Sequence, residues 1–305
     1  MGNVSARKVV GLSMTAGLLA MVSAAVGLLW GGPGGAETVV NLHGQTVALY
    51  GRGLYRNDTL LAAGNNWGSD LVTLFLGLPL LVLSAMLYAK GSLRGRFVLL
   101  GTLGYFLYIG ASYALGAVAY NEMFLVYVAQ FSAALFAFLV VFRSFTPEVL
   151  AAGLPPDMPR RWPGAFLIAS GAATLVIWMT EPVAALLAGN PPASLETRTT
   201  LFTHALDIAV IVPAALTAGF LILKRRPFGY VIAFSLLILE AMLMPVITIA
   251  TIVQLRLGIT FPPGAIVGPI AGFSVLAVLS LWVIASLLRP MRALPAGPAE
   301  PAPGR

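Results

Sequence analysis

Long apolar runs alternate with short polar segments along the whole chain. With a window of about 20 residues, the length of a membrane-crossing helix, eight such runs are found. They cover residues 9–30, 70–89, 97–118, 123–142, 164–180, 203–223, 228–252 and 265–288. The pattern predicts an all-α integral membrane protein, with about eight transmembrane helices in a single domain over residues 1–289.

The basic residues are distributed unevenly over the loops between these runs. If all eight runs cross, fourteen of the eighteen lysines and arginines lie on one side, and the other side has only Arg52, Arg56, Arg198 and Arg256. Because basic loops stay in the cytoplasm, this bias predicts cytoplasmic N and C termini. Arginine outnumbers lysine fifteen to three, as in GC-rich bacterial genomes, so we expect a bacterial cytoplasmic (inner) membrane.

The first run has an alternative interpretation as a cleaved secretory signal. Arg7 and Lys8 precede it, and the small residues Gly34 and Ala36 follow its end. Cleavage would leave seven helices. The run is about 22 residues long, against 7–15 for a signal core, which favours an uncleaved helix.

The longest polar segment, residues 31–69, is predicted to cover the outer mouth of the helices as a lid. Residues 37–50 contain two β-prone runs around His43-Gly44-Gln45, which predicts a hairpin. Asn57 and Asp58 are expected to cap a short helix that stops at Gly64. The tail, residues 290–305, is rich in Pro, Ala and Gly and is predicted to be disordered.

A weak internal similarity favours two halves, residues 1–143 and 164–289. Asp70 to Pro79, followed by a basic turn at Lys90, resembles Asp207 to Pro213, followed by a basic turn at Lys224. Parallel repeats of this kind occur in transporters. The aspartate-to-proline spacings differ, nine residues against six, so a chance similarity remains open.

Composition narrows the functional classes. The chain is 59% hydrophobic and 10% charged, with a mean hydropathy of +0.91, so a soluble protein is excluded. It has no cysteine, which removes disulfides, thiolate nucleophiles, iron–sulfur clusters and cysteine zinc sites. The net charge of +7 follows from topology, so we expect the lipid bilayer and no nucleic acid as a partner. Neither His-Glu-x-x-His, Gly-x-Ser-x-Gly nor a phosphate loop is present, so catalysis is disfavoured and no cofactor is expected.

Glu240 is the clearest candidate for function within the apolar runs. It lies about 18 Å into a hydrocarbon core about 30 Å thick, at a depth where no span carries a lysine or arginine. Pro245 follows five residues later and frees a backbone carbonyl, an arrangement used in ion and proton pathways. The alternative is a neutral glutamate hydrogen-bonded to a neighbouring helix, for instance to Gln130.

The sixth run carries a second group of polar residues. Ser194 and Glu196 are expected to begin its helix. Thr200, Thr203, His204 and Asp207 would then share one face. A histidine and an aspartate at this spacing hand protons inward or bind a metal, but one histidine and one carboxylate make an incomplete metal shell, so no metal is predicted. The structural alternative is a hydrogen-bonded pair at the rim.

The remaining polar residues have simpler explanations. Asp70 directly follows Ser69 at the start of the second run, which favours a helix cap, and Glu181 beside Pro182 is expected to end the fifth run. Tyr108 and Gln130 are expected at helix interfaces, either for packing or lining a cavity.

Three functional hypotheses follow from these patterns. In the first, the protein binds or translocates a small solute, ion or proton through an outward-facing polar cavity. Its pathway residues are then Glu240, Asp207, His204, Gln130 and Tyr108, and its gate includes His43, Asp58 and Asp70. In the second, it is a sensor or accessory subunit whose outer loop docks an unknown protein partner. The third, weaker hypothesis is an intramembrane enzyme that acts on lipid.

Overall fold

The computed structural model describes residues 6–261 and 263–293, without the side chains of residues 263–269. Within these ranges, eight helical segments are long and apolar enough to cross a membrane, as the sequence predicted. Their helices are α1 (Ala6–Leu29), α2 (Leu60–Val72), η1 (Thr73–Gly77), α3 (Leu78–Ala89), α4 (Leu93–Leu115), α5 (Phe124–Arg143), α7 (Arg161–Ala188), α8 (Phe202–Leu206), η3 (Asp207–Ile211), α9 (Val212–Leu223), α10 (Phe228–Arg256) and α11 (Pro263–Leu288). α2, η1 and α3 form one continuous segment, and α8, η3 and α9 form another.

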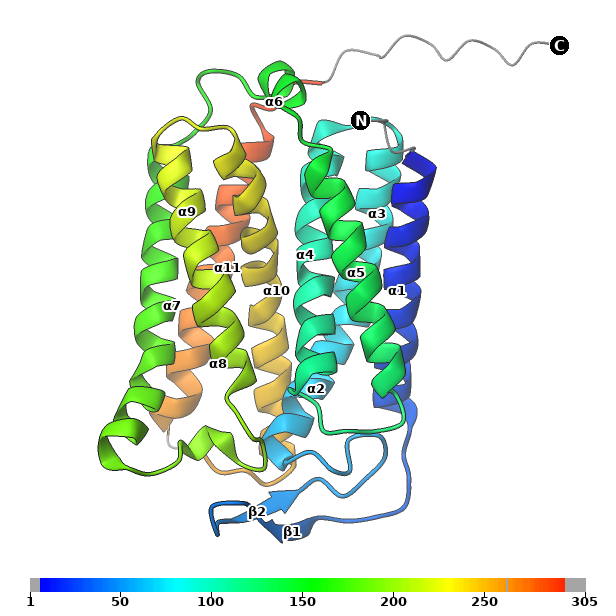
Figure 1. Cartoon of the computed structure of the whole chain (residues 1–305), viewed down its shortest axis with the longest axis vertical. Coiled ribbons are helices and arrows are strands. Elements are labelled where there is room, and N and C mark those ends of the chain that lie inside the picture. Colours follow the sequence, from blue (N-terminus) through cyan, green and yellow to red (C-terminus); the bar gives the residue numbers. More distant parts are fainter. Residues whose placement is uncertain (1–5, 262, 294–305) are drawn as a thin grey trace, which may run out of the picture.

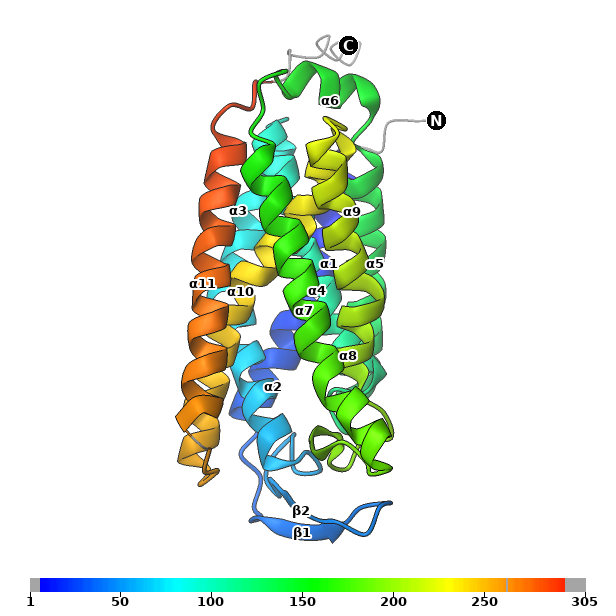
Figure 2. The same cartoon turned by 90° about the vertical axis from the view of Figure 1, so that its left-hand side faces the viewer.

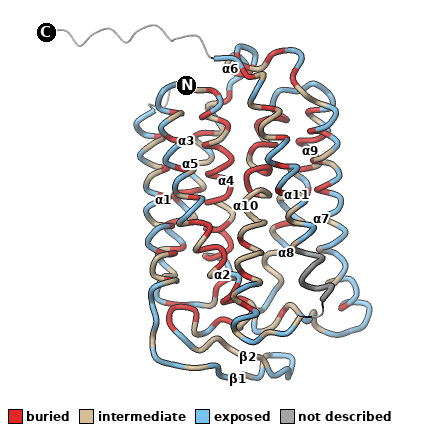
Figure 3. Tube along the Cα trace, turned by 180° about the vertical axis from the view of Figure 1, so that it is seen from behind, coloured by how far each residue is buried: buried red, intermediate tan, exposed pale blue. Residues whose placement is uncertain are grey.

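The helices form two groups that meet where α2 and α4 pack against α10. α1, α2–α3, α4 and α5 lie on one side, and α7, α8–α9, α10 and α11 lie on the other (Figure 1). The most deeply buried stretches are in these central helices (Figure 3). The rings of Phe97 and Phe234 pack there with centroids 4.8 Å apart and planes tilted by 45°. α1 packs along α5, whereas α7 and α11 touch at few positions.

The two ends of the bundle differ. One end carries the short helix α6 (Pro147–Gly153), and the other carries the predicted hairpin, β1 (Glu37–Val40) paired antiparallel with β2 (Thr46–Leu49) (Figure 2). We call them the α6 end and the hairpin end. The β-prone runs on both sides of Gly44, whose φ is 77°, explain the hairpin.

The second segment begins differently from the prediction. Its N-cap is Thr59, whose hydroxyl accepts the Ala62 N–H at 3.2 Å, and the helix does not stop at Gly64. A Cβ at Gly64 would overlap the Gln254 side chain of α10. Gly64 is therefore a close-packing position inside the helix rather than a helix stop. Asp70 is not a helix cap either, because α2 begins ten residues earlier and Asp70 lies in its third turn.

The fifth and sixth segments also depart from the prediction. α7 continues through Pro182 to Ala188, so Glu181 does not end it. Ser194 does not start the next helix, because its N–H and hydroxyl donate to the Glu181 carboxylate at 2.8 and 2.6 Å. After a short 3₁₀ turn, η2 (Ala193–Leu195), Glu196 takes a positive φ of 51°, and the helix begins at Phe202.

The first residues of the predicted tail contact α6. Met291 is buried, and the Arg292 N–H donates to the Gly153 carbonyl of α6 at 2.9 Å. Disorder of the tail stays a prediction. Residues 294–305 lie outside the described residues.

Two spans share an unusual local structure. Each contains a π-helical turn, Thr73–Gly77 or Asp207–Ile211, followed by a proline in the next turn, Pro79 or Pro213. Proline has no N–H and crowds the carbonyl four residues earlier, so a wider turn accommodates it. Each residue of the second π turn lies 134 residues after its counterpart in the first.

The same spacing of 134 residues continues into the turns at the α6 end. Lys90 and Lys224 end their helices, and the three hydrogen bonds that close each turn join equivalent residues. The next residues, Gly91 and Arg225, have positive φ angles of 75° and 57°. At this spacing, the position that corresponds to Asp207 is Thr73 and not Asp70.

The contact between α4 and α10 depends on small residues. A Cβ at Gly101 would overlap the backbone carbonyl oxygen of Phe234, whereas a Cβ at Gly11 of α1 would meet nothing within 4 Å. We therefore expect Gly101→Ala to lower the free energy of unfolding by about 1–3 kcal/mol through overpacking. Gly11→Ala should be neutral or slightly stabilising. Thermal unfolding in detergent measures both variants, and equal midpoints would contradict the prediction.

Candidate functional site

A hollow of about 450 Å³ opens at the hairpin end, where the two groups of helices meet. Three segments form its wall: the start of α2, the end of α4 with the loop after it, and the loop before α8. The lining residues are Asp58, Thr59, Ala62, Leu115, Gly116, Ala119, Tyr120, Thr197, Arg198, Thr199, Thr200 and Phe202.

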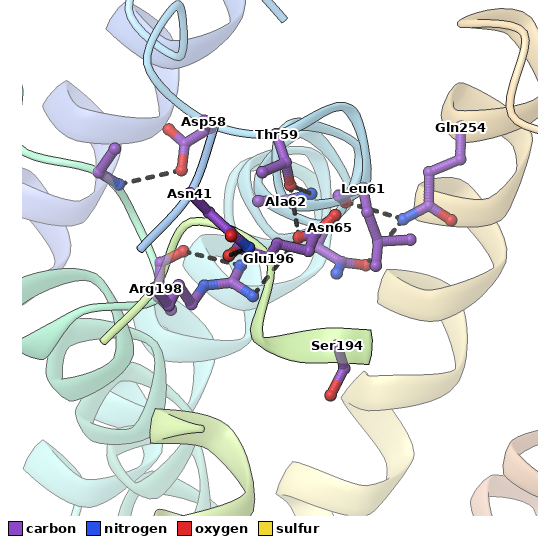
Figure 4. Close-up of polar contacts among 12 residues, drawn as sticks. Asn41, Asp58, Thr59, Leu61, Ala62, Asn65, Ser194, Glu196, Arg198 and Gln254 are labelled. Carbon is purple, nitrogen blue, oxygen red and sulfur yellow. Dashed lines mark hydrogen bonds and ion pairs between the residues drawn. The ribbon is translucent and has the colours of Figure 1, made fainter. Parts of the chain in front are cut away.

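Glu196 holds the loop before α8 against the rest of the wall (Figure 4). Its carboxylate accepts the Thr59 hydroxyl at 2.5 Å, and its backbone carbonyl accepts the Asn41 side-chain amide at 2.8 Å. Burial raises the pKa of Glu196, while the Thr59 hydrogen bond and the charge of Arg198 lower it in part. The helix cap of α2 and the hairpin are therefore joined to the loop through one residue.

Asp58 is a buried acid in the wall of the hollow. Its side chain is only 4% exposed, and its Oδ1 accepts the Ala119 N–H at 2.9 Å. Its Oδ2 and the nearby amide nitrogen of Asn66 have no hydrogen-bond partner among the described residues. Burial raises the pKa of Asp58 to about 7, although the Ala119 hydrogen bond and the Arg198 charge act in the opposite direction. Asp58 therefore changes its charge near neutral pH.

Arg198 is the basic residue of the hollow. One guanidinium nitrogen donates to the Ala117 carbonyl at 3.4 Å, and another lies 3.8 Å from the Glu196 carboxylate. Both contacts are long, and the side chain is 25% exposed. A guanidinium has five N–H donors, so most of them are not used within the described part of the chain.

A second buried acid, Asp70, lies deeper in the first group of helices. Its two oxygens accept the Tyr55 hydroxyl at 2.6 Å and the Tyr113 hydroxyl at 3.0 Å. Gly27 of α1 allows this close packing, because a Cβ there would overlap the Asp70 carboxylate. The Tyr113 ring packs edge-on against Tyr127, which lines a smaller hollow of about 210 Å³. Asp70 thus has two hydroxyl partners and no basic one.

His204 and Asp207 each contact Trp178 and do not bond to each other. The His204 ring lies 4.3 Å from the Trp178 ring between centroids, and its Nε2 lies 3.8 Å from the Glu181 carboxylate. Asp207, at the start of the second π turn, is buried beside the Trp178 indole and the Tyr108 hydroxyl. Of the residues predicted to share their helix face, Thr203 is helical and Thr200 is not, because α8 starts at Phe202.

Glu240 and Gln130 lie in different groups of helices. The Ser280 hydroxyl of α11 donates to Glu240 at 2.7 Å, and Ser170 of α7 lies beside the same carboxylate. Gln130 accepts the Ser23 hydroxyl of α1 at 2.9 Å. The suggested pairing of Glu240 with Gln130 is therefore not what the structure shows. The glutamate has serine partners instead.

The remaining predicted gate residue, His43, lies in the exposed turn of the hairpin, where its N–H donates to the Asn41 side chain. Within residues 6–261 and 263–293, no group of three or more His, Asp or Glu side chains is arranged to hold a metal ion.

Comparisons of the chain with known proteins give no family. No family model, curated protein or solved structure matches it. The functional argument therefore depends on this chain's own residues.

Sequence reasoning missed several partners in these clusters. Tyr55, Tyr113 and Trp178 gave no signal, because aromatic residues are common at membrane boundaries and helix contacts. Arg198, in contrast, did give a signal in the sequence. It is one of four basic residues on the side of the membrane that the charge bias leaves nearly without them, and such an exception needs a reason.

Proposed function

We propose that the protein binds a small polar solute in the hollow at the hairpin end and moves it, or a proton coupled to it, across the membrane. The observation that carries the proposal is the position of the hollow. Both groups of helices contribute to its wall, so a relative movement of the two groups changes its shape. Polar sites at the junction of two helical units are typical of transporters.

A series of carboxylates supports the proton pathway. Asp58 lines the hollow, Asp207 lies at the π turn of the sixth segment, and Glu240 lies about twelve residues into α10. Among the described residues, none of the three has an ion-pair partner. Acids within membrane spans are costly and mark ion or proton paths when they are not paired.

Tyr108 and Ser112 of α4 connect the hollow with Asp207 in this proposal. Leu115 lines the hollow; Ser112 lies about one turn from it and Tyr108 about two turns, on neighbouring faces of the helix. Tyr108 lies beside Asp207. The buried Ser112 hydroxyl has no hydrogen-bond partner among the described residues, so it is available to a passing water or proton.

The proposal includes an orientation and an origin of the fold. The basic turns at Lys90 and Lys224 lie at the α6 end, which supports a cytoplasmic α6 end with both termini, and a hairpin end outside a bacterial inner membrane. The matching π turns and basic turns support duplication of a four-helix unit, residues 1–143 and 164–289. Residues 31–69 then form the outer cover.

Cysteine labelling tests the proposal directly, because the chain has no native cysteine. Single variants Thr200→Cys, Asp207→Cys and Glu240→Cys are exposed to a membrane-impermeant thiol reagent from each side. The sequence suggested Gln130 as a pathway residue, but the proposal leaves it out, because it is 1% exposed, bonds Ser23 and lies in the other group of helices. Gln130→Cys is therefore the matched control. We expect fast labelling at 200 from the hairpin side and slower labelling at 207 and 240 that still exceeds labelling at 130.

The result distinguishes between the hypotheses. If positions 207 and 240 label no faster than 130 in folded protein, there is no aqueous path and translocation is wrong. All four cysteines must label fully after denaturation, which shows that the reagent and the protein amounts are adequate.

One observation favours the accessory-subunit hypothesis as a second candidate. Val40 and Leu42 of the hairpin are 69% and 85% exposed, which is unusual for apolar side chains on a small extramembrane element. A dry core in the labelling experiment, together with loss of partner capture in a Val40→Ser, Leu42→Ser variant, would support this candidate.

A further inference from the structure

The guanidinium of Arg198 has donors that residues 6–261 and 263–293 do not use. Its two contacts, at 3.4 Å to the Ala117 carbonyl and 3.8 Å to the Glu196 carboxylate, are both longer than strong charge-assisted hydrogen bonds. Glu196 is engaged elsewhere, because it accepts the Thr59 hydroxyl at 2.5 Å. The planar fork of Arg198 therefore remains free to bind a planar or tetrahedral oxyanion from the hollow.

Three threonines line the hollow together with Arg198. They are Thr197, Thr199 and Thr200, and their side chains make no hydrogen bond within the described part of the chain. Hydroxyls donate to anionic oxygens and adjust their direction freely. The volume of the hollow, about 450 Å³, lies in the range of sites for small molecules.

The other charges around the hollow decide when an anion is favoured. Asp58 faces the Ala119 N–H of the loop after α4, Asn66 of α2, and Arg198 and Glu196 of the loop before α8. When Asp58 is ionised, it repels an anion bound at Arg198. When it is protonated, the wall of the hollow has one negative charge fewer.

We propose that the hollow binds the carboxylate or phosphate group of a small solute, that Arg198 is its main ligand, and that protonation of Asp58 strengthens the binding. The proposal rests on the proposed function and names its substrate class. A proton taken up by Asp58 together with the anion also provides a physical basis for coupling the two, because each favours the other.

Binding to the purified full-length protein in lipid nanodiscs tests the proposal. Sodium acetate and inorganic phosphate are the anionic probes, choline chloride is the cationic probe, and ionic strength is held constant. We expect saturable binding of an anionic probe and no binding of choline. Acetate, which stays ionised over this range, should bind up to about tenfold tighter at pH 6 than at pH 8, because Asp58 is about ten times more often protonated at pH 6. Arg198→Gln should weaken anion binding about tenfold or more, and Arg198→Lys should lie between the two.

Matched controls separate the site from general effects of charge. Arg56→Gln removes a guanidinium at the same end of the bundle, where it pairs with Glu122 at 2.6 Å outside the hollow, and should leave anion binding unchanged. Asp58→Asn should keep the binding and remove its dependence on pH. Thermal unfolding of each variant without ligand checks that it is folded.

The outcomes separate this inference from the proposed function. Binding of choline instead of an anion, or equal anion binding by wild type and Arg198→Gln, overturns the inference but not the proposed function. If neither anion binds while Thr200→Cys labels as expected, the inference is again overturned and the proposed function is not. If nanodiscs with phosphatidylglycerol block phosphate binding, and nanodiscs with only uncharged sugar lipids do not, the phosphate group recognised is that of a lipid.

Discussion

Replacing Asp70 with alanine is expected to lower the free energy of unfolding by about 2–4 kcal/mol. The carboxylate accepts two buried tyrosine hydroxyls, from Tyr55 and Tyr113. Without it, the Tyr55 hydroxyl is left without its partner in a dry environment, which costs about 1–3 kcal/mol. The Tyr113 hydroxyl keeps the Asn66 carbonyl at 3.1 Å and loses one hydrogen bond, which costs about 0.5–1.5 kcal/mol. Asp70→Asn keeps one acceptor oxygen and should cost about half as much. Thermal or denaturant unfolding in detergent measures both variants.

A matched background shows whether the hydroxyls cause the loss. In a Tyr55→Phe, Tyr113→Phe protein there is no hydroxyl to strand, so Asp70→Ala should cost much less there than in wild type. An equal cost in both backgrounds would place the effect in packing and contradict this explanation.

Stability should also fall as the pH rises through the range in which Asp58 titrates. The pKa of Asp58 is about 7 in the folded protein and near 4 in the unfolded chain, so the folded state binds the proton more tightly. The stabilisation is complete below pH 4 and is lost progressively up to pH 7. A shift of about three units corresponds to about 4 kcal/mol over the whole window, of which about 3 kcal/mol falls between pH 5 and pH 8.

Asp58→Asn isolates this contribution. Glu196, whose pKa is also raised by burial, adds a change of the same sign, and it is present in both proteins. The difference between wild type and Asp58→Asn should therefore vary with pH, and it should level off above pH 7. A constant difference from pH 4 to pH 8 would show that Asp58 does not change its charge in this range.

The candidate site shows where sequence reasoning succeeds and where it fails. Glu240 and Asp207 stood out because carboxylates are rare within apolar runs, so each can be noticed without knowing its partner. Asp58 was expected only as a helix cap and a gate residue. The partners of Glu240 and Asp207 did not stand out. Ser280 lies 40 residues from Glu240, and Tyr108 lies almost 100 residues from Asp207, so no local spacing joins them. Gln130 looked like a neighbour of Glu240 because depth in the membrane was the only coordinate available.

Helix ends also show the difference between local signals in the sequence and contacts made in the folded protein. Gly64 and Pro182 have the local character of helix breakers, yet both lie inside continuous helices. At Gly64 the helix is stabilised by close contact with α10, and the residue preferences of a single helix do not include such a contact. Ser194 looked like a cap, but its hydroxyl bonds Glu181 instead.

The sequence alone determined the number and approximate positions of the eight apolar helices and the hairpin, because membrane length and β propensity are local properties. It also indicated which acids needed an explanation. Only the tertiary structure decided that Asp58, Arg198 and three threonines surround one hollow, and that Asp70 is held by two tyrosines. Those contacts join segments far apart in the chain, and helix packing, set by small residues such as Gly27 and Gly101, determines which segments meet.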